Sequence, residues 1–126
     1  DNNLPKINGN IIFKTTNFSY LRDGLYMTGQ KVNVGNVLVL ETEFKLKIIL
    51  TENRVMPFDD KHIKVFGIEP KQEDIIVTKA GTAWKIAFGK IAKTILNVDT
   101  SGICSSNLKK ITYSNDYVNT FWPLNE

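Results

Sequence analysis

The stretch VLVLETEFKLKIILTE, residues 37–52, decides the fold of this chain. Its first half opens with four apolar residues, 37–40, and in its second half, 44–52, the apolar side chains of Phe44, Leu46 and Ile48 alternate with lysines. Alternation with a period of two is typical of a half-buried β-strand. Because the connection between the halves is so short, we expect them to pair as a hairpin.

The segment before this hairpin is also predicted to be β-structure. IIFKTT at 11–16 indicates a first strand, and FSYL at 18–21 continues it or pairs with it. An Asp-Gly pair at 23–24 is a strong turn signal. A short strand is then expected between the turns at Gly29 and Gly35, since valines alternate there with polar residues.

A helix is predicted where this pattern ends, over DKHIKVFG at 60–67. Asp59 is placed to cap its N-terminus, and Gly67 is a typical C-terminal stop. Ile63 and Phe66 would then share its buried face.

The second half predicts a strand–helix–strand unit. EDIIVTK at 73–79 is typical of a strand that is buried on both faces, and TILNVD at 94–99 indicates a second strand. Between them Thr82 can cap a helix. One face of that helix carries Trp84, Ala87, Phe88 and Ile91. We therefore expect an α+β fold: a mixed β-sheet with an antiparallel N-terminal part, a βαβ unit near residues 74–99, and two to three short helices.

The turn that opens this helix, within KAGTAWKIAFGK at 79–90, is a candidate ligand site. Backbone N–H groups at a helix N-terminus can bind an anion, and nearby lysines would add charge. The candidate ligand-binding residues are Lys79, Gly81, Thr82, Lys85 and, after the second strand, Asp99. The same pattern is equally that of a structural turn, and the full phosphate-binding loop motif is not present. Both interpretations stay open.

Composition fits one soluble domain over residues 1–126, with 42% hydrophobic and 23% charged residues. The net charge of +3 is scattered along the sequence and only two arginines are present, so we expect no nucleic-acid binding. No apolar run is long enough to span a membrane and no signal peptide is evident, which predicts a cytoplasmic protein without membrane contact. Because the chain starts with Asp1, we expect a piece of a larger protein.

Metal and nucleophile chemistry have few candidate residues. The single histidine, His62, and the single cysteine, Cys104, cannot by themselves assemble a catalytic zinc site. They could form a nucleophile pair, but a surface histidine and a structural cysteine explain them as well. We therefore expect no catalytic residue, no metal ligand and no cofactor in this chain.

Three stretches taken in order, 22–40, 57–103 and 122–126, resemble the C-terminal domain of the microcystinase C-like (MlrC) metallopeptidases. The likeness covers residues 17–125 and rests on the order and spacing of its pieces. Positions that match the family pattern are Gly24, Gly29, Val32, Gly35, Arg54, Pro57, Phe58, Asp59, Phe66, Gly67, Ile68, Pro70, Lys79, Phe88, Ile91, Ala92, Val98, Asp99 and Gly102.

The sequence departs from this pattern at the candidate turn. Where the family has K-S-x-x-H-F-R, this chain has Ala80 for the Ser, Ala83 for the His and Lys85 for the Arg. Lys90 and Ser101 also replace family prolines. Any role of the family His or Arg is therefore lost or altered here.

The resemblance implies a two-domain zinc hydrolase whose metal ligands lie in a larger N-terminal domain. This chain would be a non-catalytic accessory domain that packs on that catalytic domain and lines one side of its cleft. A freestanding small-anion-binding module at Lys79–Lys85 and a structural or homo-oligomerising domain are the alternatives. In the latter, an aromatic tail around Trp122 would supply the contact.

Overall fold

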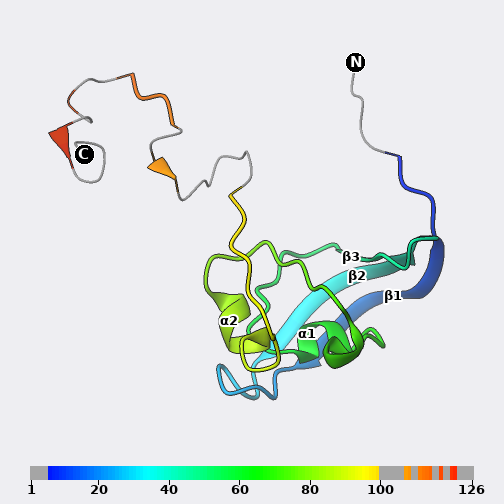
Figure 1. Ribbon diagram of the computed structural model, residues 1–126. Helices are drawn as coiled ribbons and strands as arrows, with labels where there is room; N and C mark the ends of the chain where they lie inside the picture. The colour runs from blue at the N-terminus through cyan, green and yellow to red at the C-terminus, as the bar shows by residue number, and fades with distance from the viewer. Residues whose placement is uncertain (1–5, 100–106, 109–110, 115–116, 118–119, 122–126) are drawn as a thin grey trace. The chain divides into compact units, whose positions relative to one another are not determined.

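A computed structural model describes residues 6–99, 107–108, 111–114, 117 and 120–121 (Figure 1). The chain divides into two compact units, Asp1–Lys93 and Thr94–Glu126, and each is described by itself. All helices and strands named below lie in the first unit. Within the described ranges, no helix is long and apolar enough to cross a membrane.

The first unit is built on a three-stranded antiparallel sheet with the strand order β1-β2-β3. Its strands are β1 (Asn10–Leu21), β2 (Lys31–Glu41) and β3 (Lys47–Thr51). The predicted hairpin over 37–52 is confirmed, and so is the antiparallel N-terminal part of the sheet. The chain reverses direction after Arg22 as predicted, but through a longer loop: the Arg22 carbonyl oxygen accepts a hydrogen bond of 2.8 Å from the Gly29 N–H, and the hydrogen-bonded turn joins Met27 to Gln30.

The first two strands are longer than predicted because bulges keep them continuous. The predicted runs 11–16 and 18–21 form one strand, in which Asn17 has a φ of 50° beside a register shift. Gly35 does not end a strand either: with a φ of +75° it lies inside β2. A residue in the left-handed region lets a strand absorb one extra residue and then resume its pairing.

The hairpin turn includes residues that were predicted to belong to the strand over 44–52. β3 begins only at Lys47, so Phe44 and Leu46 lie in the connection and are 84% and 55% exposed. The turn is closed by Thr42, whose hydroxyl oxygen accepts a hydrogen bond of 3.2 Å from the Leu46 N–H. The alternating pattern was therefore interpreted wrongly at Phe44 and Leu46.

The predicted helix after residue 59 is confirmed in place and in its buried face. α1 (Lys61–Lys64) presents Ile63 to the core, Phe66 follows it at 2% exposure, and Gly67 has a φ of +79°. The predicted cap is wrong: the N-cap residue is Asp60, without a side-chain cap hydrogen bond. The side chain of Asp59 is buried instead and forms an ion pair with Arg22.

Two further short helices follow, η1 (Pro70–Gln72) and α2 (Ala83–Phe88). α2 is the helix of the predicted βαβ unit, but neither 73–79 nor 94–99 is a strand in the structure. A strand needs a hydrogen-bonded neighbour, and here Ile75 and Val77 are 81% and 89% exposed instead of being buried on both faces. The parallel pair of the predicted mixed sheet is therefore not formed among the described residues.

The hydrophobic core lies between one face of the sheet and the segments that contain α1 and α2 (Figure 1). From the sheet it takes Tyr20 and the β2 valines Val32, Val34, Val37 and Val39, and from the helical half Ile63, Phe66, Ile68 and Phe88. The predicted buried face of α2 is confirmed, because Phe88 is buried and Trp84, Ala87 and Ile91 pack against this core.

Candidate functional site

The candidate turn predicted from the sequence lies on the surface of the first unit. Lys79, Gly81, Thr82 and Lys85 are all exposed, and Thr82 occupies the N-cap position of α2 without a side-chain cap hydrogen bond. The Gly81 carbonyl oxygen accepts a hydrogen bond of 3.1 Å from the indole N–H of Trp84. The Lys85 ammonium lies 5.7 Å from the centre of the same indole ring. The turn is thus organised around a tryptophan.

These contacts do not test whether the turn binds an anion, so the anion site stays a prediction. α2 has only six residues, so its N-terminal dipole is weak compared with that of a longer helix. Asp99, the fifth candidate residue, belongs to the second unit, which is described by itself. Cys104 and Trp122, which the sequence also singled out, lie outside the described residues.

The most buried charges in the described part are a pair that the sequence did not predict. Arg22, just after β1, places Nη1 3.7 Å from Oδ1 of Asp59, just before α1. The side chains are 4% and 1% exposed. Charges are almost never buried to this extent unless they are paired, because removal from water costs several kcal/mol per ion.

Two hydrogen bonds and one ring fix the position of the Arg22 guanidinium. Nε donates to the side-chain oxygen of Gln30 at 3.1 Å, and Nη2 donates to the Met56 carbonyl oxygen at 3.0 Å. The guanidinium carbon lies 5.0 Å from the centre of the Phe58 ring, within the range of a cation–π contact. Arg22 therefore links the end of β1, the β1–β2 loop and the segment that leads to α1.

A second polar contact lies beside this pair. The Tyr20 hydroxyl and Nδ1 of His62 are 3.3 Å apart, a hydrogen bond that joins β1 to α1. Burial, together with the negative charge of Asp59, raises the pKa of Tyr20 to about 12. Burial, together with the positive charge of Arg22, lowers the pKa of His62. Tyr20 is thus held protonated and His62 is held neutral.

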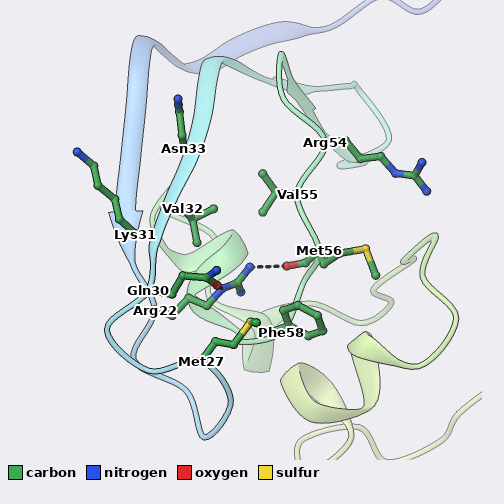
Figure 2. A pocket seen from close by; sticks show the side chains of 10 residues that line it. All are labelled: Arg22, Met27, Gln30, Lys31, Val32, Asn33, Arg54, Val55, Met56 and Phe58. Atoms are coloured by element: carbon green, nitrogen blue, oxygen red, sulfur yellow. Dashed lines mark hydrogen bonds between the residues drawn. The ribbon is translucent and has the colours of Figure 1, made fainter.

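A pocket of about 290 Å³ opens beside Arg22 (Figure 2). The charged ends of Lys31 and Arg54 point away from its centre, whereas Arg22 reaches across it to the Met56 carbonyl. The other residues that line it are Met27, Gln30, Val32, Asn33, Val55 and Phe58. The lining is therefore mixed apolar and cationic, and its central cation is already paired with Asp59.

The chemistry available here is that of a structural connection. A catalytic nucleophile needs a base within hydrogen-bond reach that can take its proton. Here His62 contacts a tyrosine whose raised pKa keeps the proton on the phenol. In the described ranges, no three His, Cys, Asp or Glu side chains come together as a possible metal site. The buried or half-buried polar residues Tyr20, Arg22, Asp59 and His62, here called the polar cluster, join the start of α1 to the sheet. We assign no reaction step to this cluster.

Sequence reasoning missed this cluster because its members are far apart in the chain. Each polar residue lies beside a local signal that explains it separately, a turn for Arg22 and a helix start for Asp59. Only the tertiary fold brings the two charges together. The one available signal was the arginine next to the Asp-Gly turn, in a chain with only two arginines.

Comparison with known proteins adds one match. The family model described as "MlrC C-terminus" matches residues 11–115 of the 126-residue chain. No curated protein and no solved structure matches the chain. The matched range contains nearly all of β1 and every later element of the first unit.

Proposed function

Because the chain belongs to the MlrC C-terminus family, we propose that it is a non-catalytic C-terminal domain that packs on a preceding domain of the same polypeptide. The observation that carries this proposal is the family match, which extends over the whole sheet except the first residue of β1. The sheet and the segments that contain α1 and α2 share a hydrophobic core, which is consistent with a folded domain of this kind.

The finer part of the proposal concerns the preceding domain. We propose that it is a zinc-dependent amidohydrolase or peptidase domain that holds all the metal ligands, and that this chain lines one side of its cleft. The resemblance of the three sequence stretches supports this. Among the described residues no three His, Cys, Asp or Glu side chains lie together as a possible metal site, and the proposal places the zinc ligands in the preceding domain.

The catalytic part is tested by comparing the full-length protein with residues 1–126 alone. Zinc is measured by elemental mass spectrometry, and hydrolysis is measured on a panel of peptide and amide substrates. We expect zinc and activity in the full-length protein and neither in the isolated chain. Stoichiometric zinc together with hydrolysis in the isolated chain would overturn the accessory role.

Packing is tested separately by denaturant unfolding. If this domain packs on a neighbour, its unfolding in the full-length protein should occur at a higher denaturant concentration than in residues 1–126 alone, since contacts made only by the folded state stabilise it. Peptide-resolved hydrogen exchange identifies which transition belongs to this domain. Identical unfolding of the domain in both proteins would contradict the proposal.

Two other expectations from the sequence, a cytoplasmic location and a homo-oligomer, stay predictions.

A further inference from the structure

One face of the sheet carries apolar side chains that the core does not use. Successive residues of a strand point to opposite faces. Val37 and Val39 point into the core, so the residues that follow them, Leu38 and Leu40, point away from it. The register places Leu40 opposite both Ile11 and Ile48, and Leu38 opposite both Lys14 and Leu50. We call Ile11, Leu38, Leu40, Ile48 and Leu50 the outer face.

The outer face is accessible and slightly hollowed. Ile11 is 59% exposed and Leu50 is 48% exposed, while the other three side chains are half-buried. A hollow of about 500 Å³ lies over this part of the sheet, with Ile11, Leu38 and Leu50 in its lining. Single exposed apolar residues are ordinary, but a row that crosses all three strands is a contiguous patch.

The strand sequences also indicate that both faces are covered. A strand with one solvated face alternates apolar and polar residues, whereas a strand buried on both faces reads as a continuous apolar run. All three strands contain such runs, IIF at 11–13, VLVL at 37–40 and IIL at 48–50. Among the described residues, the core covers one face of the sheet.

We infer that the outer face is the surface on which the preceding domain of the same polypeptide docks; this inference rests on the function proposed above. β1, an edge strand, begins at Asn10, so a chain that arrives from a preceding domain enters the sheet beside Ile11. Polar and charged residues, among them Lys14, Asn36 and Glu52, line the same hollow. An apolar centre with a polar rim is the usual anatomy of a protein interface.

The test measures the accessibility of single thiols in a Cys104→Ser background. Leu50→Cys and Ile11→Cys report on the outer face, and Phe44→Cys, at an 84% exposed turn position, is the matched control. Each variant is made in the full-length protein and in residues 1–126, and maleimide labelling is followed peptide by peptide by mass spectrometry. We expect labelling at positions 50 and 11 to be at least about tenfold slower in the full-length protein, with position 44 unchanged.

The other outcomes separate the docking face from the packing of the domains. Fast labelling at positions 50 and 11, in a full-length protein whose domains still stabilise each other, would overturn the assignment of the outer face as the docking surface. The proposed packing of the two domains would still hold. Fast labelling together with independent unfolding would overturn both proposals. Slow labelling already present in residues 1–126 would also overturn the inference. Sedimentation of that sample would then assign the cover to a second copy if it is a dimer, and to residues 94–126 if it is a monomer.

Discussion

The guanidinium of Arg22 lies 3.7 Å from the carboxylate of Asp59, and the two side chains are 4% and 1% exposed. Nη1 of Arg22 and both carboxylate oxygens of Asp59 make no hydrogen bond to the described part of the chain. The pair therefore depends on the attraction between the two charges. Such a pair adds little net stability compared with apolar residues, but the loss of one partner is costly.

Asp59→Ala should lower the free energy of unfolding by about 3–5 kcal/mol, because it leaves the Arg22 charge buried without its partner. Adding Arg22→Met to Asp59→Ala should recover part of this loss, since no unpaired charge then remains. Urea unfolding of the two single variants and the double variant gives the coupling energy. Asp23→Ala is the control: Asp23 is 63% exposed in its ion pair with Lys61, and we expect a loss of at most about 1 kcal/mol. A similar loss for Asp59→Ala would contradict the prediction.

His62 should make stability depend on pH. Its pKa is lowered in the folded protein by burial and by the charge of Arg22, so just below the ordinary pKa of about 6.5 the unfolded chain binds more protons than the folded one. The free energy of unfolding should therefore fall as the pH decreases from about 7 to 5. His62→Gln should reduce this slope.

Subtracting the His62→Gln profile from that of the unaltered chain removes the contribution of the carboxylates, which the two proteins share. The difference between the two free energies of unfolding should be constant above about pH 7.5 and should change only as the pH falls below that value. Chemical unfolding in a series of buffers measures both profiles. Parallel profiles across the whole range would show that His62 has the same pKa in both states.

The sequence predicted those parts of the fold that depend on local pattern. The hairpin of β2 and β3 follows from the apolar runs, and α1 follows from the spacing of Ile63 and Phe66 with Gly67 as the stop. Strand limits were less predictable, because the bulges at Asn17 and Gly35 depend on pairing with a neighbouring strand.

Features that depend on tertiary contact could not be predicted. The run at 73–79 has the composition of a buried strand, yet Ile75 and Val77 are exposed, because no strand in the described part of the chain pairs with the run. The Arg22–Asp59 contact exists only after β1 and α1 have packed together. The candidate turn was located correctly before α2, but its ligand role is not a property of local pattern.

Alanine substitutions at Gly67 and Gly35 distinguish the cost of backbone strain from the cost of steric crowding. Both have a φ between +75° and +79°, but a Cβ at Gly67 would meet nothing within 4 Å, whereas one at Gly35 would lie 2.6 Å from a Glu52 carboxylate oxygen. Gly67→Ala should cost about 1–2 kcal/mol from the left-handed backbone alone. Gly35→Ala should cost about 1 kcal/mol more, because Glu52 must leave its 2.9 Å hydrogen bond with the Asn36 N–H. Thermal unfolding measures both, and equal losses would contradict the crowding argument.

Phe66 and Phe44 are both predicted from the sequence pattern to be buried, but only Phe66 is buried in the structure. Phe66 is 2% exposed, and its ring centre lies 5.6 Å from those of both Phe13 and Phe18. Phe66→Ala removes these contacts and leaves a cavity, so it should lower the free energy of unfolding by about 3–5 kcal/mol. Phe44, which the alternating pattern placed in a strand, is 84% exposed, and Phe44→Ala should change it by no more than about 0.5 kcal/mol. Urea unfolding of both variants, with the isolated chain to exclude contacts of a neighbouring domain, measures the difference. A loss at Phe44 comparable with that at Phe66 would mean that the hairpin turn is packed in solution.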